Sequence, residues 1–227
     1  MAAKSMNNVL AKMRAAGRVG NYKEKGAAGE EAVFDLMHSY RTTHGGILKQ
    51  GFTYPYATNR QSQPYLGNIF WNEEEQRFYD MTKSHYKDEI DILYISNYRI
   101  FVIEVKAYHD RSIIITDQWM ERQGKKVDKS PIAQAEKHAR HLYHQLYDVL
   151  PNGAPDYITP IVCFVDESII DDRRSEQMQA YLPVRTLSGE YGVLRKIREL
   201  DKKYGVFTLN LDAIEKKLNS IERPKEE

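Results

Sequence analysis

The chain lacks several features that would place it in a specialised class of protein. Among its 227 residues only Cys163 is a cysteine, which excludes intrachain disulfides and is typical of a reducing compartment. No run approaches the roughly 18 apolar residues of a membrane span, and the N-terminus lacks the apolar core of a signal peptide. A glycine-rich phosphate loop with its lysine is also missing. We therefore expect a cytoplasmic protein without a membrane partner or a nucleotide cofactor.

An excess of charge of either sign is lacking too. The chain has 33 basic and 32 acidic side chains, so any basic footprint for nucleic acid must be local. Hydrophobic residues make up 41% of the chain, which is enough for the core of one large domain. We expect a central domain over 26–201 with an aromatic-rich insertion over 53–88. A basic arm over 1–25 precedes it, and a strand and helix over 202–227 follow.

The stretch 88–106 organises the rest of the chain. Two runs rich in β-branched and aromatic residues flank 96–99, whose composition suits a tight turn, so we predict an antiparallel hairpin. With a two-residue turn at 97 and 98, Asp91 lies directly opposite Glu104. A longer turn would shift this register.

Three charged side chains share one face of this hairpin. Because side chains alternate along a strand, Glu104 and Lys106 point to the same side, and Asp91 joins them as a cross-strand partner. Both faces are otherwise apolar, with Ile90 and Ile92 placed together on the opposite one, as in the middle of a covered sheet. Directly opposed like charges are destabilising, so two acids here require a reason.

The residues alone leave two interpretations of this cluster open. A divalent cation such as magnesium takes carboxylate and carbonyl oxygens and keeps several waters for a substrate. Alternatively, Lys106 forms a buried ion pair with Glu104 or Asp91 that only holds the sheet together.

Five motifs, taken in order, resemble a known family. They are Gly26-Ala27-Ala28-Gly29-Glu30, Glu89-Ile90-Asp91, Ile100-Phe101-Val102-Ile103-Glu104-Val105-Lys106, Trp119 and Ser130-Pro131-Ile132-Ala133-Gln134. An aspartate, twelve intervening residues and Glu-Val-Lys on an apolar strand resembles the active-site core of the restriction-endonuclease-like PD-(D/E)XK nucleases. The five motifs together are similar to the NERD family, the nuclease-related domain, over roughly residues 26–200.

Two further site residues depend on this resemblance. Residues 27–41 have helical periodicity that puts Glu30 on the core-facing stripe, where the resemblance implies an acid beside the metal site. In the alternative, Glu30 only favours the helix dipole from the first turn. A second helix begins at Ser130 and Pro131, and the resemblance implies that Gln134 in its first turn points at the active site. Otherwise Gln134 is a solvated helix residue.

Other polar residues offer weaker signals. Lys125 and Lys126 follow a turn, and Arg14 and Arg18 lie in the basic arm, so these four could contact nucleic-acid phosphates or could be ordinary solvated cations. Three histidines at 138, 141 and 144 drift about 60° per step around a helix, so we do not expect them to converge on zinc. Aromatics of the insertion could stack on bases, although a small satellite hairpin is the simpler interpretation.

Periodicity places the remaining elements. We predict strands over 47–52, 112–116, 159–165, 181–187 and 206–211, and helices over 131–150, 190–200 and 212–221. The order of strand, helix and apolar strand from residue 100 to 165 predicts a parallel crossover.

The expected fold class is α/β, with a restriction-endonuclease-like mixed central sheet flanked by helices. We expect a metal-dependent nuclease that hydrolyses phosphodiester bonds, in DNA rather than RNA. Asp91, Glu104 and Glu30 would hold Mg²⁺ or Mn²⁺, and Lys106 and Gln134 would complete the catalytic set. Duplex cutting would suggest a homodimer. The alternatives are a catalytically weak or inactive nucleic-acid-binding module and a structural or regulatory partner protein.

Overall fold

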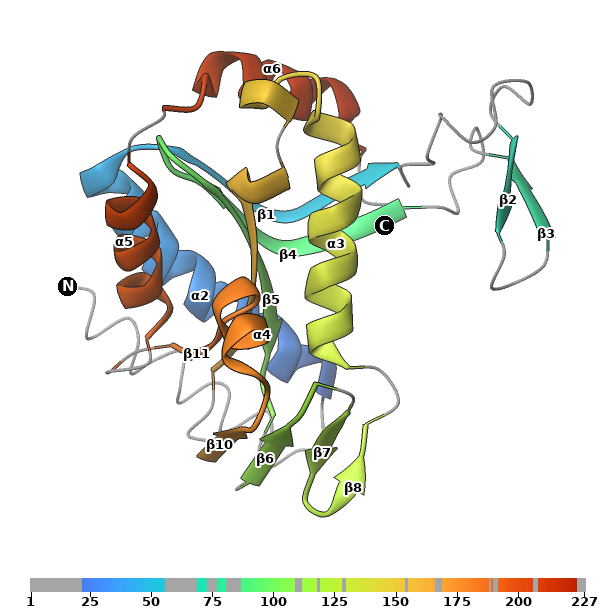
Figure 1. Ribbon diagram of the computed structural model, residues 1–227, viewed down its shortest axis with the longest axis vertical. Coiled ribbons are helices and arrows are strands. Elements are labelled where there is room, and N and C mark those ends of the chain that lie inside the picture. The colour runs from blue at the N-terminus through green and yellow to red at the C-terminus, as the bar shows by residue number, and fades with distance from the viewer. Residues whose placement is uncertain are drawn as a thin grey trace.

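The computed structural model shows a mixed sheet with helices on both faces (Figure 1). It describes residues 22–55, 69–72, 77–80, 87–108, 112–117, 119–127, 130–153, 155–165, 169–187, 189, 192–205 and 208–223. Among the helices of this described part, none has both the length and the apolar character needed to cross a membrane.

The central sheet has five strands in the order β1-β4-β5-β9-β11. Their bounds are Ile47–Pro55 for β1, Lys87–Ile95 for β4, Ile100–Lys106 for β5, Ile158–Phe164 for β9 and Val184–Thr186 for β11. The first three strands pair antiparallel, whereas β9 is parallel to both β5 and β11. This arrangement confirms the predicted α/β class, the mixed central sheet and the parallel crossover from β5 to β9.

The hairpin of β4 and β5 has the predicted register. Its ladder runs from the Ile95–Ile100 pair to the Ile92–Ile103 pair, and Ser96 N–H donates to the Arg99 carbonyl at 2.9 Å across the turn. Extending this register by one residue places Asp91 opposite Glu104. The main chain does not continue the ladder there, however, because Val105 N–H donates to Asp91 Oδ2 at 2.7 Å.

Strands β1 and β4 both change face where Gly51 meets Asp91. Gln50 pairs with Ile92 and Phe52 pairs with Ile90, and Gly51 has a φ of 56°. Ile92 packs in one core cluster and Ile90 in the cluster on the other side of the sheet. Our expectation that Ile90 and Ile92 share a face was therefore wrong. Gly51 has a left-handed backbone conformation, and the Asp91 side chain accepts a hydrogen bond from the Val105 main-chain amide. Both features interrupt the alternation of side-chain faces that regular strands maintain.

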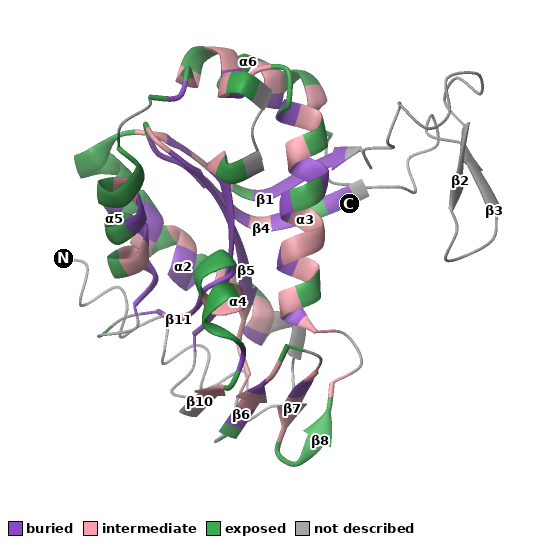
Figure 2. Cartoon of the chain, in the orientation of Figure 1, coloured by how far each residue is buried: buried purple, intermediate pink, exposed green. Residues whose placement is uncertain are grey.

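Helices cover both faces of the sheet. Two pack on one face, α2 (Tyr22–His44) and α5 (Val193–Tyr204). Two more pack on the other, α3 (Pro131–Leu146) and α6 (Leu211–Ile221). Figure 2 shows the strands between these helices as buried along most of their length. The short α4 (Glu176–Tyr181) precedes β11, and η1 (Pro151–Gly153) and η2 (Pro155–Tyr157) join α3 to β9.

A second sheet lies below the N-terminal end of α3 in Figure 1. Its order is β10-β6-β7-β8, with bounds Ile169–Asp172, Ser112–Ile115, Met120–Arg122 and Lys125–Lys126. The predicted turn between β7 and β8 is present, with φ values of 50° at Gln123 and 77° at Gly124. Within the insertion, β2 (Ile69–Asn72) and β3 (Arg77–Asp80) pair antiparallel, as expected for a satellite hairpin.

Several boundaries differ from the sequence predictions. Helix α2 begins at Tyr22, within the stretch expected as the basic arm, and β1 and β4 extend into the insertion to leave 56–86 between them. The strand expected over 181–187 is shorter, because α4 ends at Tyr181. The C-terminal helix is confirmed, but residues 208–210 form no strand, and 206–207 lie outside the described residues.

Candidate active site

The candidate active site lies where β5 ends, beside the first turns of α3 and the N-terminal half of α2 (Figure 1). Strand β5 brings Glu104 and Lys106 to this point on the face that α3 covers, and β4 brings Asp91 beside them. The two strands of one hairpin thus place three charged side chains around one strand end.

Glu104 is the most buried group of the site and is 3% exposed. One of its oxygens, Oε1, accepts a hydrogen bond from Lys106 Nζ at 2.5 Å. The other, Oε2, lies 3.4 Å from His138 Nδ1 of α3, and neither of these two buried atoms has a hydrogen-bond partner of good geometry. One carboxylate oxygen of the site is thus buried beside His138 without a well-formed hydrogen bond.

The two carboxylates of the hairpin differ in their pKa values. Burial and the charges of the nearby Glu104 and Glu30 together raise the pKa of Asp91 to about 7, against the opposing effects of the Val105 hydrogen bond and the Lys106 charge. Burial would also raise the pKa of Glu104, but His138 and Lys106 hold it below its ordinary value. The pair therefore tends to carry one proton at neutral pH in the absence of a cation.

Lys106 remains a cation in this environment. Burial alone would lower its pKa, yet the charges of Glu104 and Asp91 raise it above the ordinary value. An ammonium group at this position compensates only part of the negative charge that Asp91, Glu104 and Glu30 contribute.

Glu30 reaches the site because α2 approaches β5 closely. Gly29, the preceding residue, is buried, and a Cβ atom there would meet Ala107 Cβ and Val165 Cγ2 at 3.0 Å each. Its lack of a side chain lets the helix pack against the ends of β5 and β9. Glu30 is half-buried and close enough to raise the pKa of Asp91.

The donor set suits a hard divalent cation. Within the described part of the chain, no three His, Cys, Asp or Glu side chains converge as a complete metal cage. Magnesium is commonly held by only one or two carboxylates together with waters and substrate phosphates, so a complete cage is not required. A cation would satisfy the Glu104 Oε2 atom, which has no well-formed hydrogen bond, and the destabilised charge of Asp91.

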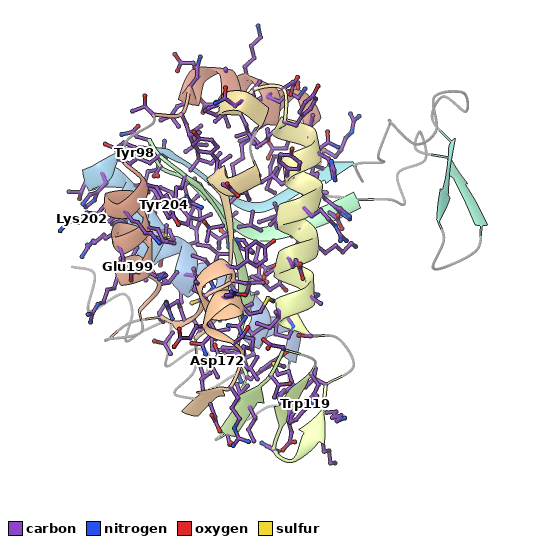
Figure 3. The ribbon with its side chains drawn as sticks, viewed as in Figure 1. Tyr98, Trp119, Asp172, Glu199, Lys202 and Tyr204 are labelled. Atoms are coloured by element: carbon purple, nitrogen blue, oxygen red, sulfur yellow. The ribbon has the colours of Figure 1, made fainter. Side chains whose placement is uncertain are left out.

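The structure links the other predicted site residues less directly to the carboxylates of the candidate active site. Gln134 is half-buried in the first turn of α3, one helical turn before His138, and no contact of its side chain with the acids is seen. Lys125 and Lys126 are exposed on β8, and Lys126 Nζ lies 5.5 Å from the ring centroid of Trp119, which Figure 3 labels. Arg14 and Arg18 lie outside the described residues.

His138 is the site residue that sequence reasoning missed. The three histidines of α3 do not converge, as expected, but each has a different surrounding. His138 faces Glu104, His141 is buried against Asp88, and His144 is exposed. Asp88 also pairs with Lys137 at 3.1 Å. The available signal was the four-residue spacing from Gln134, which puts His138 on the same helix face.

Comparison with known proteins gives one family match. The family model described as NERD, nuclease-related domain, matches residues 25–165. No curated protein matches the chain. Among solved structures, a crystal structure of the protein of unknown function AF1548 is similar, with 10% sequence identity and a TM-score of 0.34. That alignment covers 78% of this chain and 66% of the other, and a likeness this low supports no conclusion about function.

Proposed function

The chain belongs to the nuclease-related domain family, and from this membership we propose that it is a metal-dependent nuclease that hydrolyses phosphodiester bonds, in DNA rather than RNA. The single observation that supports the proposal best is the state of Glu104. This carboxylate is buried at a strand end beside Asp91 and Lys106, and its Oε2 atom has His138 nearby but no well-formed hydrogen bond. A buried anionic oxygen without a well-formed hydrogen bond is costly unless a ligand compensates it.

Asp91 and Glu104 would hold Mg²⁺ or Mn²⁺, with Glu30 contributing directly or through a water. A cation bound there would lower the pKa of a coordinated water and offset charge on the scissile phosphate. Asp91 is held in place by the Val105 amide, so this carboxylate is oriented before any ligand arrives.

Lys106 would stabilise the negative charge that develops on the phosphate and orient the attacking water. Its raised pKa favours the cationic form, which supports charge stabilisation over removal of a proton from water. His138 would keep Glu104 in its orientation. Gln134, one turn earlier on α3, would contact the water or the phosphate.

Nucleic acid would approach this strand end from outside the sheet. Lys125 and Lys126, together with Arg14 and Arg18, would contact the phosphate backbone away from the scissile bond. A homodimer would supply two such sites for the two strands of a duplex.

A second candidate is a nucleic-acid-binding module without efficient cleavage. The observation in its favour is the 2.5 Å contact between Lys106 Nζ and Glu104 Oε1, because an ion pair of this kind could hold the sheet together with no cation. A structural or regulatory partner protein would need the same ion pair and no nucleic acid.

The test is cleavage of supercoiled plasmid and of single- and double-stranded DNA and RNA oligonucleotides with magnesium, manganese or a chelator. Glu104→Gln and Glu30→Gln are compared with Glu31→Gln, which changes the exposed neighbour on the same helix. We expect metal-dependent cleavage that Glu104→Gln abolishes, Glu30→Gln reduces and Glu31→Gln leaves unchanged. Binding of nucleic acid without cleavage by any variant would support the binding module.

A further inference from the structure

A cavity of about 580 Å³ opens beside α3, away from the candidate active site. Its floor is formed by Arg99, which directly precedes β5, and by Thr159 of β9, whereas Glu104 lies near the other end of β5. Five residues of strand separate Arg99 from Glu104, or about 16 Å at 3.3 Å per residue. The cavity is therefore a separate site on the molecule.

Arg99 is a buried cation without a paired anion. It is 8% exposed, and its hydrogen bonds run from Nε and Nη2 to Thr159 Oγ1, at 3.0 and 2.8 Å, and from Nη2 to the Asp156 carbonyl at 2.5 Å. All of these acceptors are neutral. Among the described residues no carboxylate lies within ion-pair distance of Arg99.

This state of Arg99 is costly in the absence of a ligand. Burial lowers the pKa of the guanidinium, because desolvation penalises its charge, and the opposing effects of Tyr204, Asp156 and Asp201 do not cancel that shift. Nη1 makes no hydrogen bond to the described residues, and the guanidinium lines an open cavity. The Nε and Nη2 atoms of this guanidinium donate to the protein, whereas the Nη1 edge does not donate to any described residue. Such a guanidinium is suited to an anion that accepts two hydrogen bonds.

Aromatic rings line the cavity, and one of them stacks on Arg99. Tyr204, at the end of α5 and labelled in Figure 3, lies with its ring centroid 4.1 Å from Arg99 Cζ. Tyr143 of α3 and Tyr181 of α4 also line the cavity. Tyr181 and Tyr204 are 48% and 41% exposed, which is unusual for large rings, and they bring stacking surfaces to the rim.

Three further charged residues line the cavity, Glu136 and Arg140 of α3 and Asp156 of η2. Arg140 adds a second cation, and Glu136 adds an acceptor one helical turn away. Tyr181 is near both, since the charges of Glu136 and Arg140 act on its hydroxyl in opposite directions. The cavity thus combines the buried Arg99 guanidinium, a donor suited to a phosphate, with flat rings and with two acidic residues, Glu136 and Asp156, that can accept from N–H or O–H groups.

We propose that this cavity binds a nucleoside monophosphate unit, with its phosphate on Arg99 and Arg140 and its base against the tyrosine rings. The volume is within the range of small-ligand sites. The unit could come from a free nucleotide or from one residue of a nucleic-acid strand that also reaches Glu104. The strand as a source rests on the proposed nuclease function, whereas binding of the nucleotide itself does not.

The test uses the full chain in chelator, so that no strand is cleaved. Calorimetry measures the binding of deoxyadenosine 5′-monophosphate, deoxyadenosine and inorganic phosphate. Fluorescence anisotropy measures a labelled single-stranded oligonucleotide. The variants are Arg99→Gln, Arg140→Gln and Tyr181→Ser. The matched control is Tyr147→Ser, which removes the 58% exposed tyrosine of the same region that does not line the cavity.

We expect the monophosphate to bind more tightly than deoxyadenosine or phosphate alone. Arg99→Gln and Tyr181→Ser should each weaken its binding by roughly 10-fold, as expected for one charged hydrogen-bonding partner and one stacking ring. Arg140→Gln should weaken it less, and Tyr147→Ser should have no effect. If Arg99→Gln does not fold, the two exposed variants still decide the result.

The remaining outcomes separate the two sources and the two proposals. Parallel losses of oligonucleotide affinity in Tyr181→Ser and Arg140→Gln indicate a strand, and unchanged oligonucleotide affinity indicates a free nucleotide. Phosphate that binds as well as the monophosphate, or monophosphate binding that Tyr181→Ser does not change, overturns the cavity proposal. Cleavage without nucleotide binding overturns the cavity proposal and leaves the nuclease proposal intact. Nucleotide binding without cleavage overturns the nuclease proposal and leaves the cavity proposal intact.

Discussion

His138 of α3 and Glu104 of β5 face each other across a buried interface, with Nδ1 3.4 Å from Oε2. This contact joins a helix to the strand that ends at the candidate active site. It also distinguishes one histidine of α3 from the two that follow it at three-residue intervals. Helix α3 therefore makes both a site contact and a structural contact, which substitutions can separate.

The three histidines of α3 should respond differently to replacement by alanine. His138→Ala should reduce cleavage by roughly 10-fold with a small change in Tm, because Glu104 loses the group that orients it. His141→Ala should lower the free energy of unfolding by about 3 kcal/mol, because Asp88 stays buried without that partner. His144→Ala should change neither, since this side chain is exposed. Plasmid cleavage and thermal melting distinguish the three, and equal effects would contradict the assignment of His138.

Lys106→Met should separate binding from hydrolysis. We expect nucleic-acid affinity within about twofold of the unmodified protein, because one of several phosphate contacts is lost, and cleavage reduced by roughly 100-fold or more. Anisotropy in chelator and plasmid cleavage in magnesium make the two measurements. An equal loss of both would show that Lys106 acts in substrate binding only.

Asp91→Asn should stabilise the metal-free protein at pH 8. The folded state raises the pKa of Asp91 to about 7, so it holds a proton that the unfolded chain releases near pH 4. The free energy of unfolding therefore falls as pH rises through this window. The asparagine variant lacks this loss, which is on the order of 4 kcal/mol, so its stability advantage at pH 8 should vanish near pH 4.

Asp88→Asn is the matched control on the same strand. Its pKa is lowered because His141 and Lys137 overcome the effect of burial, so its ionised form stabilises the fold above the unfolded pKa. That contribution is lost as pH falls through the lowered value. Asp88→Asn should therefore lower Tm at pH 8, opposite to Asp91→Asn. Melting curves in chelator from pH 4 to 8 provide the comparison, and a fall in Tm for both variants would contradict it.

Magnesium should raise the Tm of the unmodified protein. A ligand that binds only the folded state at about 100 times its dissociation constant adds about 2.7 kcal/mol. Glu104→Gln should abolish this gain, and a chelator should reverse it. If magnesium leaves Tm unchanged while the protein cleaves nothing, the ion-pair interpretation of Lys106 and Glu104 is the correct one.

Gly29→Ala should damage the site through the packing of α2. Its new methyl group meets Ala107 and Val165 at 3.0 Å, so the helix must move by a few tenths of an ångström and carry Glu30 with it. We expect a loss of about 1 kcal/mol or more, partly offset by helix propensity, together with reduced cleavage. Gly26→Ala is the control, because no atom lies within 4 Å of its Cβ. It should gain up to about 1 kcal/mol with unchanged cleavage.

The sequence predicted the sheet well because its signals are local. Two apolar runs and a two-residue turn defined the register that puts Asp91 near Glu104, and a helix between apolar strands defined the parallel crossover. Glu30 was found from helical periodicity together with a resemblance. Each of these inferences used spacing along one element or the order of consecutive elements, and none required knowledge of the angles at which elements cross.

What the sequence did not predict depends on contacts between elements. The role of His138 depends on the angle at which α3 crosses β5, which no spacing reveals. The face of Ile90 was assigned wrongly because strand alternation was assumed to continue through Asp91. A glycine at position 51 inside the neighbouring strand was the available sign of a local break, since glycine in a strand often marks one.

The paired ends of β1 and β4 have an evolutionary consequence. Pro55 and Lys87 are cross-strand partners, so the chain leaves the sheet and returns to it at a single place. A segment anchored in this way can lengthen, shorten or be exchanged without altering the register of either strand, because its closure is already provided by the pairing. Sequence changes can therefore accumulate between these two residues while Asp91, Glu104 and Lys106 keep their places in the sheet.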